Sequence, residues 1–302
     1  MLHFILAVIF TAALYLLMRA FPKFQVNALH AVIFNYYTCV ATALLLMPNR
    51  VEYFQTNWGS TATLLTLALG ILFVVVFVLI GLTTTKVGVA VASLSSNMSL
   101  VIPVIFGLFV FQNNNKDFTF LNYLGLILAL VALALSTYQK ETNTTSGLKN
   151  KWILLLPILL FLSSGTNNTL INYVSAKFYR PDQAALFTAI ACTGSIVAGS
   201  TFLLFKILTA KEKVKWQSIV GGFILGVPNF LSFYYLLAAL RDFGNSAAFV
   251  FPIYNVLSML FATLMAWILF KEELSTTKKI GMAIAVIAIL LISYQEILAS
   301  FG

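Results

Sequence analysis

The sequence predicts an all-α membrane protein whose ten transmembrane helices form two inverted five-helix repeats. Composition is the first observation, because the 302 residues are 61% hydrophobic and only 9% charged. A soluble domain carries roughly 25% charged residues, so this chain cannot cover a water-facing surface. The spacing of the charges and an internal repeat are the second and third observations, and they give the number and arrangement of the helices.

The few charged residues divide the chain into ten uncharged segments, each close to or above the length of a transmembrane helix. Such a helix needs roughly 17–25 residues. The segments lack the alternation of a barrel strand, and in lipid a helix satisfies its own backbone hydrogen bonds. The first begins without a basic leader, so we expect a helix rather than a removable signal peptide. The segments are 2–18, 24–49, 53–85, 87–115, 118–139, 152–176, 183–205, 216–240, 243–270 and 280–295.

A shift of 156 residues places the second half of the chain on the first without gaps. Gly125 then falls on Gly281, and the Tyr-Gln pair at 138–139 falls on the pair at 294–295. Matches of Leu and Ala are common by chance in apolar sequence, whereas glycines and a Tyr-Gln pair in one register are not. The register therefore indicates an internal duplication.

The duplication predicts a first repeat over 1–140, a connector over 141–151 and a second repeat over 152–302. Each repeat holds five of the predicted helices, and an odd number makes the second repeat enter the membrane from the opposite side. Inverted repeats are common in secondary transporters, where the substrate site lies between the halves near the midplane. Rocking of one half against the other then alternates access to that site.

One segment inside an apolar run is unusually polar: SSGTNNTLINY, at 163–173. On a helix Ser164, Asn168 and Asn172 share one face, and Asn167 lies beside it. Unpaired amides in hydrocarbon cost several kcal/mol, so these side chains must face protein or a wet cavity. They either join helices, at about 0.6 kcal/mol per hydrogen bond, or line a substrate cavity. The equivalent positions of the first repeat carry no amide, which favours the cavity.

Polar residues in four other predicted helices are candidates for the same cavity, because a hydroxyl or an amide within a span also needs a partner. Their alternative role is hydrogen bonding within or between helices. The candidates are Ser95, Ser96, Asn97 and Ser99 in the fourth helix, Tyr254, Asn255 and Ser258 in the ninth, Asn35 and Tyr36 in the second, and Asn229 and Tyr234 in the eighth.

Pro103 and Pro252 lie in the fourth and ninth helices, close to these polar residues. Proline lacks a backbone N–H, so it frees the carbonyl group one turn earlier and can kink the helix. A freed carbonyl beside serine and asparagine would be a ligand contact. The alternative is a tolerated kink, with serine hydrogen-bonded to its own helix.

The segment LFKEELSTTKKIGMAIAVIAILLISY, at 269–294, resembles the end-of-repeat pattern of EamA-type transporters of the drug/metabolite transporter superfamily. In that pattern an apolar helix precedes a glutamate, a short connector and a glycine that opens the last helix. Glu272 and Gly281 take these positions, whereas the first repeat keeps Gly125 but has Lys116 in place of the glutamate. The resemblance implies ten helices in two repeats and transport of amino acids, sugars, drugs or nucleotide sugars.

The predicted function is secondary transport of a small neutral or zwitterionic metabolite by alternating access. No Asp, Glu, Lys or Arg lies in the middle of a predicted span. A proton relay usually needs a titratable group within the membrane, and a strongly anionic substrate would need a cation there, so we expect neither. The nucleotide-sugar transporters of the family are implied to carry a GALNK-like stretch, which this sequence lacks.

Two other functions stay open. A lipid-handling flippase of the same fold would need a lateral apolar groove that opens to the bilayer. A membrane-embedded enzyme would need a catalytic cluster, and the two histidines and nine acidic residues form none in the sequence. We expect no cofactor, and no metal site, because two cysteines supply too few ligands.

The expected partners are the small-molecule substrate and the lipid bilayer, with the chain a monomer or a homodimer. The net charge of +9 does not indicate nucleic acid, because the Lys and Arg residues lie in short connectors near lipid headgroups.

The basic residues also predict an orientation in the plasma membrane, which is the inner membrane in a bacterium. With ten spans both termini lie on one side, and the connectors of that side hold 5 Lys and Arg against 13 on the other. The positive-inside rule puts the side with 13 in the cytoplasm and both termini outside it. The family resemblance implies the reverse, with cytoplasmic ends.

Overall fold

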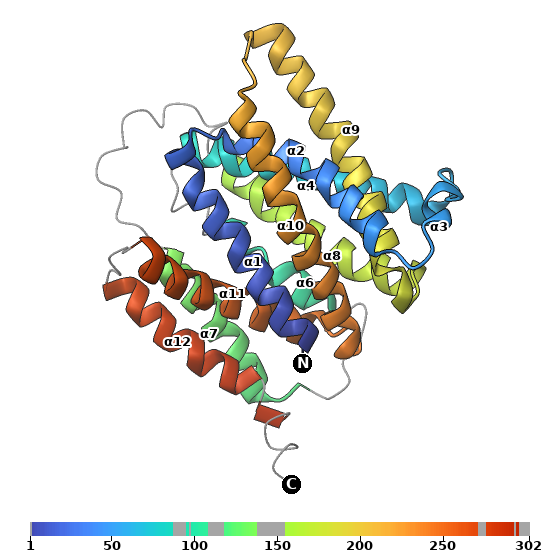
Figure 1. Cartoon of the computed structure of the whole chain (residues 1–302). Helices are drawn as coiled ribbons and strands as arrows, with labels where there is room; N and C mark the ends of the chain where they lie inside the picture. Colours follow the sequence, from blue (N-terminus) through green and yellow to red (C-terminus); the bar gives the residue numbers. More distant parts are fainter. Residues whose placement is uncertain are drawn as a thin grey trace. The chain divides into compact units, whose positions relative to one another are not determined.

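The chain is helical and contains no β-strand in the residues that the computed structural model describes, which are 2–86, 95–96, 98–107, 118–137, 155–270, 276–292 and 294–295. Asn97, Lys116, Glu272 and the Tyr-Gln pair at 138–139, which the sequence predictions use, lie outside these ranges. The elements (Figure 1) are α1 (Leu2–Ala20), η1 (Phe21–Phe24), α2 (Ala28–Leu46), α3 (Val51–Phe54), α4 (Thr61–Lys86), α6 (Val101–Ile105), α7 (Phe120–Thr137), α8 (Leu155–Phe178), η4 (Pro181–Gln183), α9 (Ala184–Ala210), α10 (Trp216–Asp242), α11 (Ala247–Phe270) and α12 (Thr276–Ile292).

Six helical segments among the described residues are long and apolar enough to cross a membrane. Two further apolar helices, α7 and α12, are shorter, and α8 has the length, at 24 residues, but contains many polar side chains. The chain is therefore an integral multi-pass membrane protein, as predicted, whereas the number of ten spans stays a prediction. The six are Leu2–Phe24, Ala28–Leu46, Thr61–Thr83, Pro181–Ala210, Trp216–Asp242 and Ala247–Leu269.

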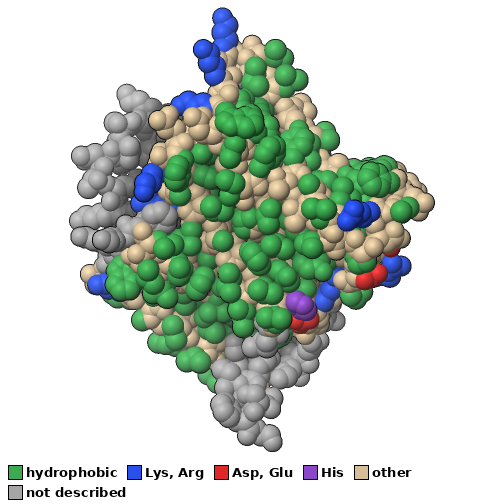
Figure 2. Space-filling view, in the orientation of Figure 1, with side chains coloured by type: hydrophobic (Ala, Val, Ile, Leu, Met, Phe, Trp, Pro, Cys, Tyr) green, Lys and Arg blue, Asp and Glu red, His purple; other side chains and the backbone are tan. Residues whose placement is uncertain are grey.

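The outer surfaces of α1 and α10 are apolar, as contact with lipid requires. Leu2 and Ile5 on α1, and Phe223 and Ile224 on α10, are exposed by 45–67%. Hydrophobic side chains cover the part of the surface where these two helices lie, and most Lys and Arg side chains lie at the edges of the view (Figure 2). This distribution matches helices that face hydrocarbon along their length and water at their ends.

The chain divides into two compact units, each built from two separate stretches. Unit 1 comprises Met1–Phe77 and Leu170–Asp242, and unit 2 comprises Val78–Thr169 and Phe243–Gly302. Each unit thus takes helices from both halves of the sequence. The predicted repeats are defined by sequence similarity, which this division does not test, so their boundaries stay predictions.

In unit 1, α4 approaches α9 closely at Gly70. A methyl group on Gly70 would lie 1.9 Å from the carbonyl oxygen of Ala191, so the contact requires glycine. Ser195, one turn further along α9, donates its hydroxyl hydrogen bond to the Gly70 carbonyl oxygen at 2.9 Å. Small residues allow helix backbones to come together in this way within a membrane.

A second contact in unit 1, between α2 and α10, has the same form. A methyl group on Gly226 would lie 2.5 Å from the carbonyl oxygen of Asn35, and Cys39 Sγ donates a hydrogen bond to the Gly226 carbonyl oxygen at 3.3 Å. The 156-residue shift relates this contact to the α4–α9 contact. Asn35 corresponds to Ala191, Cys39 to Ser195 and Gly226 to Gly70. The register of the sequence repeat therefore coincides with a repeated helix contact.

In unit 2, α7 packs along α12, and Gly125 lies at their contact. A methyl group on Gly125 would lie 2.8 Å from the side chain of Ile292. Asn122 Nδ2 donates a hydrogen bond to the carbonyl oxygen of Ile292 at 2.9 Å, and Thr119 Oγ1 lies 2.7 Å from the Tyr294 hydroxyl. These hydrogen bonds join the segment at the start of α7 to the segment at the end of α12.

Candidate functional site

The polar residues of α8 combine burial with missing hydrogen bonds. Ser164 and Asn172 are 6% and 1% exposed, and Asn167 and Asn168 are half-buried. Ser164 Oγ, Asn167 Oδ1 and both amide atoms of Asn172 are buried without a hydrogen-bond partner. Thr169, in contrast, donates to the carbonyl oxygen of Gly165 at 2.9 Å. Because buried polar atoms in proteins are nearly always paired, these gaps indicate places where water or a solute completes the hydrogen bonds.

Within unit 2, Gly165 brings α8 close to the turn that precedes α6. A methyl group on Gly165 would lie 2.8 Å from the carbonyl oxygen of Ser99 and 2.3 Å from the side chain of Ile102. The unpaired Ser164 is the neighbour of this glycine. Ser164 and the serine-containing segment before α6 therefore lie in one region of unit 2, as the cavity prediction requires.

Ser99 donates hydrogen bonds to the backbone of the two serines before it. Ser99, fully buried, donates its hydroxyl hydrogen bond to the carbonyl oxygen of Ser96 at 2.6 Å, and its backbone N–H donates to the carbonyl oxygen of Ser95 at 3.2 Å. Ser95 and Ser96 are themselves half-buried. The alternative interpretation, serine bonded to its own helix, thus applies to the Ser99 hydroxyl.

The backbone around Pro103 differs from the expectation. Pro103 lacks the N–H that would reach the Ser99 carbonyl oxygen, but Ile102 N–H donates to that oxygen at 3.0 Å instead. The chain turns at Ser99 and Leu100, and the regular helix α6 begins only at Val101. The expectation of a free carbonyl at this position is wrong, because a tighter turn supplies the missing donor.

In α11 the predicted polar residues have different surroundings. Asn255 Nδ2 donates to the carbonyl oxygen of Phe251 at 2.8 Å, one turn earlier on the same helix. Ser258 is 2% exposed and its hydroxyl has no partner, whereas Tyr254 is half-buried and does interact with other groups. Pro252 is buried inside α11, which continues to Phe270. Ser258 is therefore the residue of this group whose hydrogen bonds are incomplete.

Asn35 and Asn229 pair with each other in unit 1. Asn229 Nδ2 donates to Asn35 Oδ1 at 2.6 Å, and Asn35 Nδ2 donates to the carbonyl oxygen of Val32. Tyr36 is buried, and the ring of Tyr234 stacks on Phe230 at a centroid distance of 5.6 Å. These contacts favour a packing role for the pair between α2 and α10, and the cavity role stays a prediction.

A polar pocket of about 450 Å³ lies at one end of unit 1, where α3 and the start of α4 meet the segment before α9. Gln183 Nε2 donates to Glu52 Oε2 at 3.3 Å, and Arg180 pairs with Asp182 through Nε at 3.2 Å. This pairing raises the pKa of the exposed Arg180. Sequence reasoning did not indicate the pocket, because its residues come from two connectors whose contact no pattern encodes.

His30 is a second feature that sequence reasoning missed, since its place near the start of a span indicates an interfacial side chain. The residue is 1% exposed, and Nε2 lies 3.0 Å from Glu212 Oε1. Lys206 Nζ lies 2.9 Å from the other oxygen of Glu212. The hydrogen bond from Lys206, together with the charge of Lys206, lowers the pKa of Glu212. The three side chains join α2, α9 and the connector before α10.

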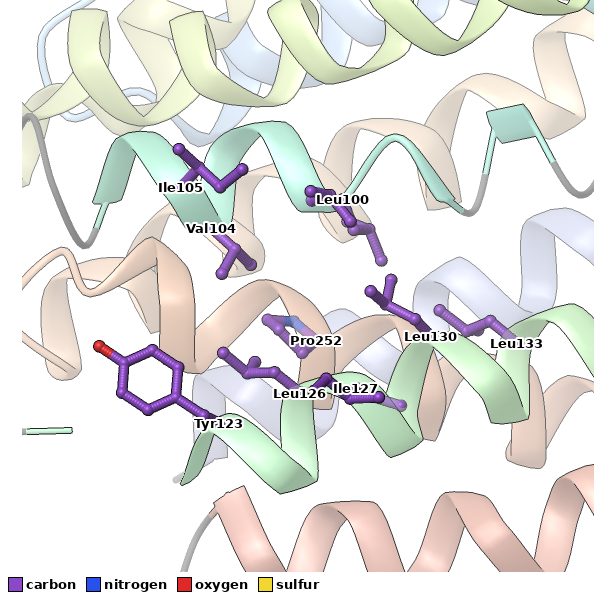
Figure 3. Close-up of a pocket in the computed structure, with 11 residues that line it drawn as sticks. Leu100, Val104, Ile105, Tyr123, Leu126, Ile127, Leu130, Leu133 and Pro252 are labelled. Carbon is purple, nitrogen blue, oxygen red and sulfur yellow. The ribbon is translucent and has the colours of Figure 1, made fainter. Parts of the chain in front are cut away.

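An apolar cavity of about 310 Å³ lies within unit 2 (Figure 3). Leucine, isoleucine and valine side chains of α7 and α6 converge on it, Pro252 lies behind them, and the ring of Tyr123 lies at one end. No charged side chain lines it. Such a cavity suits a hydrocarbon chain better than a polar solute.

No group of three or more His, Cys, Asp or Glu side chains that could hold a metal occurs in the described part of the chain. The two cysteines, Cys39 and Cys192, are buried free thiols.

Comparisons with known proteins show what the chain is similar to. Residues 150–294 match the model of the EamA-like transporter family. An uncharacterized protein of Haemophilus influenzae is 24% identical over 299 residues, covering 97% of this chain and 98% of that protein. A crystal structure of another protein, 14% identical, aligns with a TM-score of 0.68 over 97% of this chain and 96% of its own, a likeness of fold alone.

Over residues 150–294 the chain is therefore similar to the EamA-like transporters of the drug/metabolite transporter superfamily. This match confirms the resemblance that the segment 269–294 indicates.

Proposed function

We propose that the protein is a secondary transporter that moves a small neutral or zwitterionic solute by alternating access between two inverted five-helix repeats. The observation that carries the proposal is the set of unpaired buried polar atoms on α8, in a chain whose second half matches a transporter family. Ser164, Asn167 and Asn172 offer amide and hydroxyl groups. A polar solute completes their hydrogen bonds and removes the cost of leaving them unmade.

The inverted repeat is supported by the equivalent contacts at Gly70 and Gly226 in unit 1. Each glycine admits a helix of the other repeat, so the two halves exchange the same type of contact. In a carrier built from inverted repeats, each repeat takes the same structural role in turn as access alternates between the two sides of the membrane, so the repeats should contact each other in equivalent ways. The duplicated glycine contact is what such a symmetry predicts.

Proteoliposomes test the proposal, after a thermal-shift screen of the purified protein against metabolite pools has found a stabilising solute. Asn168→Leu is expected to fold like the wild type and to lower uptake. Thr169→Val is the matched control, because Thr169 Oγ1 bonds to its own helix and the change should leave uptake unaltered. Normal uptake per folded molecule of Asn168→Leu, or no uptake by the wild type, would overturn the proposal.

A lipid-handling flippase is the second candidate, and the apolar cavity of unit 2 favours it. Ile105 and Ile127, two of its lining residues, are 47% and 59% exposed, so the cavity lies near a lipid-facing surface. Transfer of a fluorescent phospholipid between the leaflets of proteoliposomes separates the candidates. Fast lipid transfer without solute uptake would favour the flippase.

We further propose a location in the plasma membrane, with both termini outside the cytoplasm, and a monomer or homodimer as the working state. With ten spans, the N-terminus and the connectors before α4, α9 and α11 share one side of the membrane. The pairs His3–Asp242 and Glu52–Gln183 each join two of these segments, which is consistent with that arrangement. The pair His30–Glu212 fits the other side. The charge count of the connectors then decides which side is cytoplasmic.

A further inference from the structure

A groove of about 410 Å³ lies within unit 1, where the end of α1 and the short helix η1 meet the first turns of α10. We call it the α1–α10 groove. The side chains that line it are apolar except that of Gln217. Phe24 and Trp216, two of them, are 63% and 69% exposed, so the groove opens at the surface of the protein. Its size and its apolar lining are typical of a ligand site.

The walls of the α1–α10 groove are held together by contacts within unit 1. The backbone N–H of Asn27 donates to Ser218 Oγ at 2.9 Å, which ties the segment after η1 to α10. A methyl group on Gly221 would lie 2.9 Å from the side chain of Val26, so this segment and α10 are in close contact. The groove between them is therefore preformed, as ligand sites usually are.

Basic residues adjoin the exposed aromatic residues of the groove. Lys23 directly precedes Phe24 in η1, and Lys215 directly precedes Trp216 at the start of α10. Both lysines are exposed. Lys and Arg side chains gather at the top of the view in Figure 2, where α9 ends and α10 begins in Figure 1. The apolar groove thus lies beside a positively charged end of the unit.

The positive charge of this end is hardly balanced within the protein. Segments 19–27 and 206–215 together hold six basic residues and one acidic residue. The acidic residue, Glu212, is already paired with Lys206 at 2.9 Å. Among the described residues, no carboxylate pairs with Lys23 or Lys215. A ligand of this region therefore meets free positive charge next to an apolar surface.

An anionic phospholipid has the chemistry that fits both features, because it combines a negatively charged phosphate with hydrocarbon chains. Tryptophan is typical of the level at which lipid headgroups lie, and Trp216 lies at the entrance of the groove. The positive-inside rule places this end of the chain in the cytoplasm, and the cytoplasmic leaflet is the one that carries anionic lipids. The backbone N–H groups at the start of α10 also favour an anion there.

We propose that the α1–α10 groove binds an anionic phospholipid, with an acyl chain against Phe24 and Trp216 and the phosphate held by Lys23 and Lys215. The site is separate from the polar residues of α8 and from the apolar cavity of unit 2. It does not depend on what the protein transports. The bound lipid bridges η1 and α10, so the stability of unit 1 depends on the lipid composition of the membrane.

The fluorescence of Trp216 reports on lipid in the groove, because Trp216 lines it. Trp58, Trp152 and Trp267 are replaced by phenylalanine. The protein is then reconstituted into phosphatidylcholine bilayers with increasing fractions of phosphatidylglycerol or phosphatidylcholine whose acyl chains carry bromine, which quenches tryptophan on contact. Brominated phosphatidylglycerol is expected to quench at a lower mole fraction than brominated phosphatidylcholine. A chain that keeps only Trp267, 52% exposed on α11, is the control and should be quenched equally by both lipids.

Lysine variants of the Trp216 chain test the phosphate contact. Lys23→Gln and Lys215→Gln should each raise the half-quenching fraction of phosphatidylglycerol roughly fivefold, toward that of phosphatidylcholine, because each basic residue contributes attraction to an anionic headgroup. The phosphatidylcholine curve should not change. Lys177→Gln is the matched control, since it removes an equal charge from an exposed residue at the end of α8 that does not line the groove.

A groove-filling variant tests the acyl chain. Ala20 lines the groove, so Ala20→Phe should reduce the preference for phosphatidylglycerol although both lysines are intact. Ile9→Phe adds a ring at an exposed position of α1 outside the groove and should keep the preference. The lysine variants decide the question if Ala20→Phe does not fold.

Equal quenching of Trp216 by the two lipids, with all lysines present, would overturn the proposal. A preference for phosphatidylglycerol that survives Lys23→Gln and Lys215→Gln together, or that survives Ala20→Phe, would overturn it as well. If neither lipid quenches Trp216 and the protein is a dimer in light scattering, a second copy of the chain covers the groove and the lipid site is refuted.

Discussion

Replacing Asn172 by leucine is expected to make the protein more stable and less active. The side chain is 1% exposed, and both amide atoms are unpaired in the structure. An unsatisfied buried polar group costs about 1–3 kcal/mol, and leucine has a similar shape without polar atoms. Asn172→Leu should therefore raise the free energy of unfolding by about 1–3 kcal/mol. Transport should fall roughly tenfold or more, because a polar contact to the solute is lost.

The assay compares the unfolding midpoint and the solute uptake of the same purified preparations. Asn229→Leu is the matched control, since it removes an amide that donates to Asn35 Oδ1 at 2.6 Å. That variant should lose about 0.6 kcal/mol, the average for hydrogen bonds between membrane helices, and at most about 1.7 kcal/mol. A loss of stability in Asn172→Leu like that in Asn229→Leu would refute the reasoning, because it would mean that the Asn172 amide is paired within the protein.

Three further predictions follow from the packing, the charges and the sequence. Gly70→Ala should strongly destabilise the protein, because its methyl group would lie 1.9 Å from a backbone oxygen. Gly81→Ala is the control, and with nothing within 4 Å of the added methyl group it should be neutral or stabilising by up to about 1 kcal/mol. The unfolding midpoints of the two variants test this difference. Folding lowers the pKa of Glu212, so the ionised Glu212 carboxylate stabilises the folded protein. This stabilisation is complete above the unfolded-state pKa of 4.5 and is lost as the pH falls through the folded-state pKa. Glu212→Gln should therefore flatten the dependence of stability on pH in that acidic range. In a background without native cysteines, an impermeant thiol reagent should label Gly302→Cys but not Asn143→Cys in intact cells, and the opposite pattern would restore the family's orientation.

The sequence predicts the helical class well because the membrane leaves few alternatives. Uncharged segments of sufficient length must be helices in lipid, and α1, α2, α4, α9, α10 and α11 all lie within such segments or overlap them. The spacing of Ser164 and Asn172 also predicts that both lie on one helix, and the structure has both on α8. These features depend only on local composition and helical period, which a single sequence contains.

Contacts between distant segments are what the sequence could not supply. The pairing of Asn35 with Asn229 depends on which face of α2 meets α10. The burial of His30 depends on Glu212, which lies in a connector far along the chain. Each outcome is set by packing geometry, and periodicity specifies a helix face but not its neighbour.

Solute counterflow in proteoliposomes tests alternating access most directly. Vesicles containing the purified protein are loaded with a high concentration of an unlabelled stabilising solute and diluted into a trace of the same solute in labelled form. A carrier that exposes its site to one side at a time should accumulate the label transiently above its equilibrium level, and Asn172→Leu should reduce this overshoot. Label that only approaches equilibrium, or that enters no faster than in protein-free vesicles, would contradict the account.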